Sequence, residues 1–112
     1  MMRLASWNVN SIRARSESVV AWAVDADVDV VALQETKCTD DGFPVMSFLA
    51  AGYDVAFTGS GGYNGVAIAS RIGLDEVEYG FEGQPAFDGE VEARAIAAVA
   101  VDARRQVAFG VQ

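Results

Sequence analysis

The pattern of apolar and polar positions predicts a chain that starts with a strand, a helix and a second strand. Residues Arg3–Trp7 are predicted to form a short strand, and Val28–Leu33 is a β-branched run typical of a strand covered on both faces. Ser16 is the expected N-cap of a helix over Ser16–Ala26. The apolar stripe of that helix would consist of Val19, Val20, Ala23 and Val24. Such a β-α-β start favours a mixed α/β sheet with helices on the outside.

The rest of the pattern predicts one short helix and several more strands. Pro44 is expected to open a helix that runs to Ala51 and stops at Gly52. Strands are expected at Tyr53–Thr58, Val66–Ser70, Asp75–Tyr79, Arg94–Val101 and Gln106–Val111. The third of these would be an edge strand, the last two would form a hairpin through residues 102–105, and residues 80–90 would be irregular. The predicted core consists of Val30, Val31, Leu33, Val55, Phe57, Val66, Ile68, Ile96 and Val99.

The sequence stops inside the predicted strand Gln106–Val111, without a following helix or polar tail. Such an end would leave a sheet edge unpaired and a sheet face uncovered. We therefore expect the 112 residues to be the N-terminal portion of one longer domain.

Composition narrows the class of protein. Apolar residues make up 52% of the chain, which is typical of a globular domain, and no apolar run is long enough to span a bilayer. The N-terminus lacks the features of a secretory signal, so no membrane partner is expected. The single cysteine, Cys38, and the absence of histidine argue against disulfides and Cys/His zinc sites. We expect a cytoplasmic protein in which Cys38 is an inert thiol, because the usual histidine base is missing.

The net charge of −8 argues against non-specific binding of nucleic acid through bulk charge. It leaves open a local site at which a divalent cation reverses the sign that a phosphate meets. The segment GSGGYNG matches neither a GxGxxG nor a Walker-type loop, and we expect it to be a flexible strand connection.

Polar clusters follow or precede three of the predicted strands. They are Asn8 with Asn10, then Gln34–Lys37, and then Tyr63 with Asn64. Strand ends on one side of an open α/β sheet are where ligands bind, and an amide and a carboxylate would make a partial shell for Mg²⁺. Two plainer readings stay open at this point, in which the asparagines form turns and Glu35 is a solvated strand end. Arg13 and Arg15, with Lys37, would contact a phosphate backbone or belong to a solvated turn.

Several segments occur together in an order and spacing that resemble the exonuclease III family of abasic-site DNA endonucleases. They are LASWNVNSIRAR, DVDVVALQETK, GYDV, NGVAIASR and EARAI. The resemblance is to the N-terminal part of this family, which lies within the wider endonuclease/exonuclease/phosphatase superfamily. It covers essentially the whole chain. The RAR after the first motif and the lysine after QET favour the DNA-repair branch over the lipid and inositol phosphatases.

The resemblance implies a fold and a set of site residues. The fold would be a four-layered α/β sandwich in which two mixed sheets lie between helices, and this chain would supply roughly the first sheet and its helices. Glu35 would be a ligand of the catalytic Mg²⁺, with Mn²⁺ as the alternative ion. Asn8 would orient the catalytic groups or take part in the metal site. Residues that would support the site or contact DNA are Asn10, Arg13, Gln34, Lys37 and Asn64.

The activity implied by the resemblance is hydrolysis of double-stranded DNA 5′ to abasic sites and at 3′ ends. The family's YxPN, GDxN and SDH motifs, which carry its tyrosine, base and histidine, do not occur in this sequence. We therefore expect the 112 residues alone to be inactive. Two alternatives remain: a short binding module or pseudoenzyme that dimerises through Gln106–Val111, and a phosphatase of the same superfamily.

Overall fold

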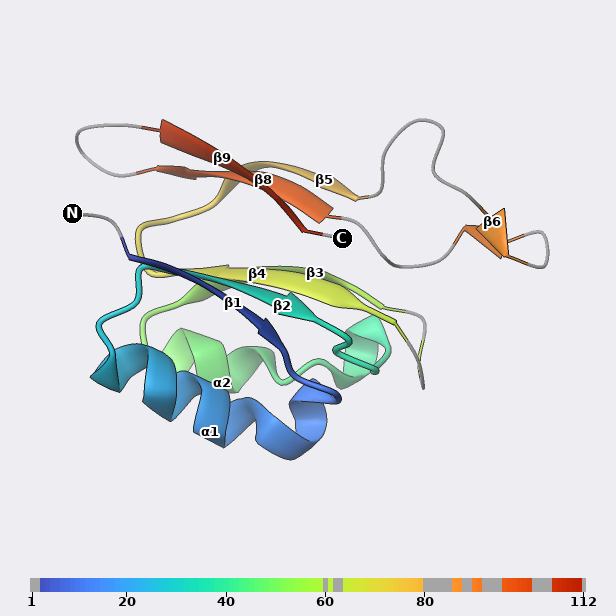
Figure 1. Cartoon of the computed structure of the whole chain (residues 1–112), viewed down its shortest axis with the longest axis horizontal. Coiled ribbons are helices and arrows are strands. Elements are labelled where there is room, and N and C mark those ends of the chain that lie inside the picture. The colour runs from blue at the N-terminus through green and yellow to red at the C-terminus, as the bar shows by residue number, and fades with distance from the viewer. Residues whose placement is uncertain are drawn as a thin grey trace.

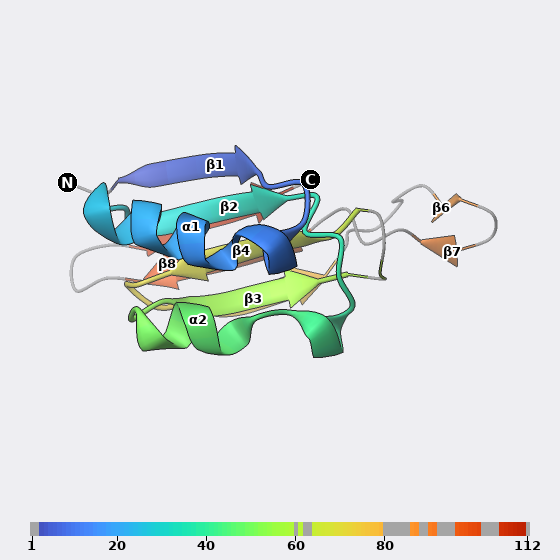
Figure 2. The same ribbon diagram turned by 90° about the horizontal axis from the view of Figure 1, so that it is seen from below.

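A four-stranded sheet covered by two helices forms the N-terminal part of the fold. The computed structural model describes residues 3–59, 61, 64–79, 86–87, 90–91, 96–101 and 106–111. The sheet has the order β1-β2-β4-β3, with β1 at Leu4–Asn8, β2 at Val30–Gln34, β3 at Asp54–Thr58 and β4 at Val66–Ser70. Strands β1 and β2 are parallel, whereas β4 is antiparallel to both of its neighbours. Helices α1 (Ile12–Asp25) and α2 (Val45–Ala50) lie side by side on one face (Figure 2).

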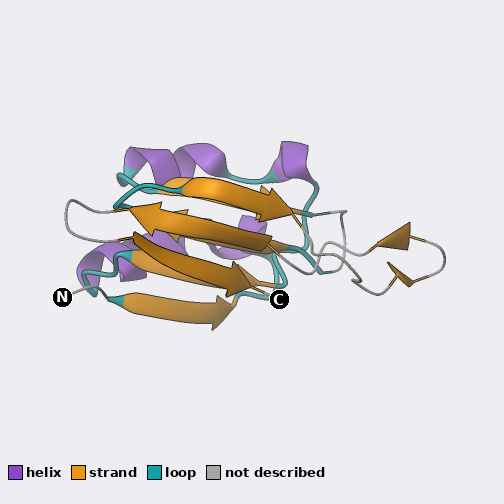
Figure 3. Cartoon of the chain, turned by 90° about the horizontal axis from the view of Figure 1, so that it is seen from above, coloured by secondary structure: helices purple, strands orange, loops and turns teal. Residues whose placement is uncertain are grey.

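A second sheet lies on the other face of the first (Figures 1 and 3). It has the order β5-β8-β9, with β5 at Asp75–Tyr79, β8 at Ile96–Val101 and β9 at Gln106–Val111, and all its pairs are antiparallel. The described residues thus form three of the four expected layers, and the predicted α/β class is confirmed. The expectation that the chain supplies roughly the first sheet and its helices is too narrow, because the chain also contributes strands of the second sheet.

The buried side chains follow the alternation expected of strands covered on both faces. On β2, Val31 and Leu33 pack with the helices, while Val30 packs toward the second sheet. On β4, Ile68 faces the second sheet and its neighbours face the helices. Of the predicted core, Val30, Val31, Leu33, Val66 and Ile68 are buried, and Val55 and Phe57 are partly buried against it. The burial of Ile96 and Val99 lies outside the described residues.

Helix α1 begins four residues before the predicted start, at Ile12 rather than Ser16. Ser16 is therefore no N-cap but a buried residue inside the helix. The cap position belongs to Ser11, whose side chain makes no capping hydrogen bond. The buried stripe is Ile12, Ser16, Val19 and Ala23, and Val24 is exposed. Val19 and Ala23 of the predicted stripe are therefore confirmed as buried, whereas the prediction for Val24 is wrong.

The other boundaries agree with the prediction to within two residues at each end. Gly52 follows α2 with φ of 88°, a left-handed conformation that suits a helix stop. β5 is an edge strand of its sheet, and β8 pairs with β9 as the predicted hairpin. The segment expected to be irregular contains a separate two-stranded ladder of β6 (Ala86–Phe87) and β7 (Glu90–Val91). The residue ranges 80–85, 88–89, 92–95 and 102–105 lie outside the described residues, as does Tyr63.

A short 3₁₀ helix, η1 (Asp40–Gly42), joins the end of the β2 loop to α2. Among the helices that the structure describes, none is both long and apolar enough to cross a lipid bilayer.

Candidate active site

The polar clusters noted in the sequence, apart from Tyr63, meet at one rim of the four-stranded sheet. Because β1 and β2 are parallel and in register, Asn8 pairs with Gln34 at the ends of both strands. Because β4 runs the opposite way, its first residue, Val66, pairs with Gln34 on the other side. The segments after β1, after β2 and before β4 therefore lie at the same edge, where the arrowheads of β1 and β2 point in Figure 1.

Asn8 and Glu35 are in direct contact at this rim. The Asn8 side-chain amide nitrogen donates a hydrogen bond to Glu35 Oε2. Asn8 Oδ1 in turn accepts the backbone N–H of Asn10 at 3.2 Å. Both functional atoms of the Asn8 amide are thus used within the protein, and the amide fixes the direction of the Glu35 carboxylate.

Lys37 completes the side-chain cluster. Its Nζ donates to Asn10 Oδ1 and lies 3.9 Å from Glu35 Oε1, the carboxylate oxygen that Asn8 leaves free. The Lys37 and Glu35 side chains are 30% and 44% exposed, so the cluster is open to solvent and to a ligand. The predicted grouping of Asn8, Asn10, Glu35 and Lys37 is what the structure shows.

Backbone hydrogen bonds join the three loops into one unit. The N–H groups of Ser11 and Ile12 donate to the carbonyls of Glu35 and Thr36, both at 2.9 Å. These bonds satisfy the first N–H groups of α1, which no cap side chain does. On the other side, the N–H of Thr36 donates to Gly65 O at 3.1 Å and that of Lys37 to Asn64 O at 2.8 Å. The Glu35–Lys37 segment therefore lies between the β1–α1 loop and the residues that precede β4.

Residues with a positive φ angle, which is uncommon for residues other than glycine, cluster at this rim. Six described residues other than glycine have positive φ, and five of them belong to these loops. They are Asn10 (46°), Ser11 (93°), Glu35 (53°), Lys37 (55°) and Asn64 (60°). Such conformations persist only where surrounding contacts enforce them, and they cluster at functional sites. Here the enforcing contacts are the hydrogen bonds between the loops.

Thr36 and Gly65 are also part of the site, and neither is among the site residues predicted from the sequence. Thr36 is 1% exposed, with Glu35 and Lys37 on either side of it. A Cβ atom on Gly65 would lie 2.1 Å from Thr36 Oγ1, and the φ of Gly65 is 92°. Gly59 is as tightly placed, since a Cβ there would lie 2.1 Å from the carbonyl oxygen of Cys38. The expected flexible glycine loop is therefore closely packed at Gly59 and Gly65.

Two predicted site residues have other partners. Gln34 Nε2 donates to Ser6 Oγ at 3.0 Å, so this side chain ties β2 to β1. Arg13 is exposed on the first turn of α1, with its side chain near Gly42 of η1. Arg15 donates from Nη1 to the Asn10 carbonyl at 3.0 Å and thus reaches the cluster.

Two residues next to the cluster, Cys38 and Asn64, have buried side-chain atoms. Burial raises the pKa of the Cys38 thiol, and the Arg13 guanidinium opposes that shift only in part. A buried thiol with a raised pKa is a poor nucleophile, in line with the expected inert role. The Asn64 Nδ2 atom is buried and has no hydrogen-bond partner among the described residues. A buried N–H without an acceptor is uncommon in folded proteins.

The donor set at the rim fits a magnesium ion held by one carboxylate. No cluster of three or more acidic or cysteine side chains is present within the described parts of the chain. Magnesium usually keeps several waters and binds through one or two carboxylates together with substrate phosphates. Glu35 Oε1 is the available oxygen, while Asn8 and Asn10 hold the groups around it.

The chain is similar in sequence to curated proteins that it covers only in part. It is 38% identical over 89 residues to Recombination repair protein 1 of Drosophila melanogaster. It is 34% identical over 80 residues to Exodeoxyribonuclease III of Haemophilus influenzae. These alignments cover 78% and 71% of this chain but 13% and 30% of those two proteins. The chain thus spans less than a third of the length of these two proteins.

Solved structures share its fold. The Neisseria 3′ phosphatase NExo, bound to a product DNA hairpin, superposes with a TM-score of 0.83 at 32% identity, over 96% of this chain and 40% of that one. An AP endonuclease from Archaeoglobus fulgidus superposes with a TM-score of 0.78 at 40% identity, over 88% and 37%. The sequence profile of the endonuclease/exonuclease/phosphatase family matches residues 5–105. The resemblance indicated by the SWNVN and LQETK segments is confirmed, and the chain belongs to the endonuclease/exonuclease/phosphatase family.

Proposed function

We propose that the protein containing this chain is a Mg²⁺-dependent phosphodiesterase of DNA repair, of the exonuclease III type. It would hydrolyse double-stranded DNA 5′ to abasic sites and remove nucleotides at 3′ ends. One observation carries the proposal: a half-exposed carboxylate, Glu35, is oriented by the Asn8 amide at the sheet rim of a family member. The similarity to exodeoxyribonuclease III and to an AP endonuclease supports the choice of DNA as the substrate.

Glu35 would hold the metal ion through Oε1. The ion, Mg²⁺ or Mn²⁺, would neutralise charge on the phosphate and on the leaving oxygen. Asn8 would act as a positioning residue, because its amide nitrogen holds Glu35 Oε2 and its oxygen receives Asn10 N–H. In its predicted role as a metal ligand, Asn8 would use the second lone pair of the oxygen that accepts the Asn10 N–H.

The basic and amide side chains around Glu35 would receive the phosphodiester backbone. Lys37 and Arg15 carry positive charge at the rim and contact Asn10, and Arg13 lies on the adjacent helical turn. Phosphate contacts of this kind set the position of a protein on DNA without reading its sequence. In an acidic protein, they would have to act locally, together with the metal ion.

The 112 residues alone would be inactive, because the aspartate base and the histidine expected from the resemblance are not in the sequence. The test is cleavage of a duplex with one abasic analogue by the full-length protein, its Glu35→Gln variant and residues 1–112. We expect Mg²⁺-dependent cleavage by the full-length protein only. Cleavage by the Glu35→Gln variant at the wild-type rate would overturn the proposal that Glu35 holds the metal ion. Cleavage by residues 1–112 would overturn the proposal that the catalytic base and histidine lie outside these residues.

A second candidate activity is removal of 3′ phosphate groups from DNA. It is favoured by the match to the Neisseria 3′ phosphatase, whose fold agrees over 96% of this chain. Both activities would need a metal ion that neutralises charge on a phosphate group, and Glu35 would hold that ion in either case. Three matched duplexes separate them, with an internal abasic site, a 3′ phosphate or a plain 3′ hydroxyl. A protein that binds these duplexes and hydrolyses none would instead be a binding module or pseudoenzyme.

A further inference from the structure

Lys37 is held by two acceptors on the carboxylate side of the rim. Its Nζ donates to Asn10 Oδ1 and lies 3.9 Å from Glu35 Oε1. That oxygen is the one that the Asn8 amide leaves free, because Asn8 binds Oε2. The ammonium group therefore lies beside the Glu35 oxygen that Asn8 does not bind.

The backbone imposes this arrangement. Glu35 and Lys37 both have left-handed φ angles, of 53° and 55°, and the residue between them is buried. The Lys37 N–H is also fixed by the Asn64 carbonyl at 2.8 Å. Both side chains thus emerge on the same side of the loop, whereas a free surface lysine would be hydrated and mobile.

We propose that Lys37 is a built-in competitor of the divalent cation at Glu35. In the metal-free protein its ammonium balances the carboxylate; a divalent ion that binds Oε1 displaces it, and the freed ammonium then faces the substrate phosphate. This inference rests on the proposed function, because it takes Glu35 to be the metal ligand. It makes Lys37 a residue that sets metal affinity as well as one that contacts the substrate.

The distances give the size of the effect. A magnesium ion lies about 2.1 Å from its oxygen ligands. An ion on Oε1 would therefore be within about 6 Å of Nζ if Lys37 did not move, since Nζ is 3.9 Å from Oε1. Even at the dielectric constant of water, repulsion between a divalent and a single charge at that distance lowers affinity roughly tenfold. Screening by salt reduces this factor, so we expect removal of the charge to tighten metal binding about three- to tenfold.

Direct titration of Mn²⁺ tests the inference without any turnover. The full-length protein, free of DNA, is titrated with Mn²⁺ and the unbound ion is measured by electron paramagnetic resonance. Lys37→Met removes the charge and keeps an unbranched side chain one atom shorter, and Lys37→Arg keeps the charge. Arg15→Met is the matched control, because Arg15 also contacts Asn10 but makes no contact with Glu35 in the described structure.

We expect Lys37→Met to bind Mn²⁺ about three- to tenfold more tightly than wild type, and Lys37→Arg and Arg15→Met to stay within about twofold. Equal or weaker binding by Lys37→Met would overturn the inference, and so would an equal gain in Arg15→Met, which would indicate a general charge effect. The Glu35→Gln variant separates the two proposals. If it still binds Mn²⁺ like wild type, the proposed metal ligand is wrong; if it does not and Lys37→Met shows no gain, only the competitor role fails.

Discussion

At the scale of single residues, the Asn8 amide decides how Glu35 can act. Asn8 is an exposed side chain, so its loss should cost little stability, but it holds one oxygen of the Glu35 carboxylate. Groups that orient a metal ligand typically contribute 10- to 100-fold to metal affinity or activity. A small amide at a strand end thus has more influence on chemistry than on folding.

We expect Asn8→Ala to lower metal-dependent activity of the full-length protein about 10- to 100-fold, with an unchanged melting temperature. Asn8→Asp should be no better, because it replaces the N–H donor by a second acceptor against Glu35 Oε2. Initial rates at several Mg²⁺ concentrations give both the rate and the metal dependence. Ser6→Ala is the control on the same strand, since it removes only the bond from Gln34 and should stay within about twofold. A wild-type rate in Asn8→Ala would contradict the positioning role.

The sequence predicts Asn8, Glu35 and Lys37 as site residues, but it does not predict the contact between Thr36 and Gly65 that holds their segments together. Asn8, Glu35 and Lys37 are polar residues next to apolar runs, and that contrast marks them. Thr36 is a threonine between polar residues, and nothing local shows that it is buried. Gly65 lies in a glycine-rich stretch, where one required glycine looks like any other. Their importance arises from the contact of one with the other, which joins segments far apart in the chain.

At the scale of elements, hydrogen bonds join the loop after β1, the loop after β2 and the residues before β4, and each of these segments contains residues with a left-handed backbone conformation. The start of α1 illustrates the consequence for prediction. Its first N–H groups bond to the Glu35 and Thr36 carbonyls and not to a capping side chain, so the local signal for the helix start was absent. The strands β2 and β4 were easier, because each is an uninterrupted apolar run.

The close approach of Gly65 to Thr36 offers a matched test of the contacts between these loops. Gly65 and Gly52 have similar φ angles of 92° and 88°, but a Cβ on Gly52 would have nothing within 4 Å, whereas one on Gly65 would meet Thr36 Oγ1. We expect Gly52→Ala to lower the free energy of unfolding by about 1 kcal/mol through backbone strain alone. Gly65→Ala should cost about 2–4 kcal/mol and also reduce activity, because it displaces the segment that carries Glu35.

Urea denaturation and initial rates of the full-length protein measure both quantities. Equal losses of stability in Gly65→Ala and Gly52→Ala would show that the loops have room to relax. The same stability loss without a fall in specific activity would show that the position of Glu35 does not depend on this contact.

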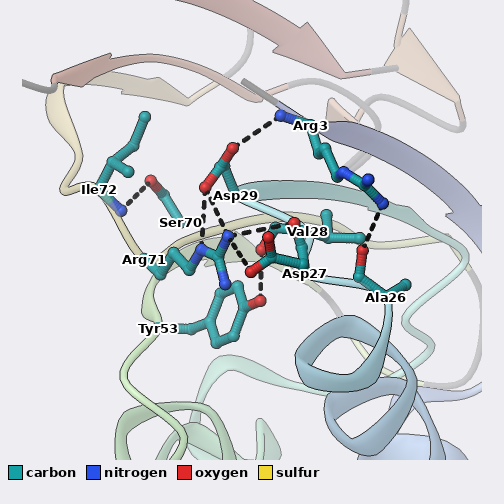
Figure 4. A network of polar contacts seen from close by, with 9 residues as sticks. All are labelled: Arg3, Ala26, Asp27, Val28, Asp29, Tyr53, Ser70, Arg71 and Ile72. Carbon is teal, nitrogen blue, oxygen red and sulfur yellow. Dashed lines mark hydrogen bonds and ion pairs between the residues drawn. The ribbon is translucent and has the colours of Figure 1, made fainter. Parts of the chain in front are cut away.

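At the scale of the whole molecule, one rim of the first sheet carries the candidate active site, and we expect the opposite rim to contribute to stability. The rim opposite Glu35 carries an ion-pair network centred on Arg71 (Figure 4). Arg71 Nη2 lies 2.7 Å from Asp27 Oδ1 and 2.9 Å from Asp29 Oδ1, and Nε donates to Asp29 Oδ1 at 2.9 Å. The Tyr53 hydroxyl donates to the Val28 carbonyl in the same region. These contacts tie the start of β2 to the end of β4 and the start of β3.

Because this network lies at the opposite rim, its loss should separate stability from activity. We expect Arg71→Met to lower the free energy of unfolding by about 1–3 kcal/mol, since it leaves Asp29 without its charged partner. Specific activity well below the melting temperature should not change. Arg3→Met, which removes a single bond to the Ala26 carbonyl, is the control and should cost less than about 1 kcal/mol. A large fall in the specific activity of fully folded Arg71→Met would show that this network also affects the rim that carries Glu35.

The same network predicts how stability depends on pH. Burial alone would raise the pKa of Asp29, but hydrogen bonds from the Arg3 N–H and the Arg71 side chain outweigh it and hold the pKa below its ordinary value. A carboxyl group with a lowered folded-state pKa stabilises the protein above its unfolded pKa of about 3.9, and that stabilisation is lost as the pH falls through the folded value. Wild type should therefore exceed Asp29→Asn in stability at pH 6, and the difference should shrink below about pH 4.

Urea midpoints of the full-length protein between pH 6 and pH 3 would measure this convergence. In Arg71→Met the carboxylate keeps the Arg3 N–H but loses the guanidinium, so removal of Asp29 in that background should give a smaller and less pH-dependent effect. A stability difference between wild type and Asp29→Asn that stayed constant down to pH 3 would mean that the charge of Asp29 does not contribute, and that its hydrogen-bond geometry alone holds this rim together.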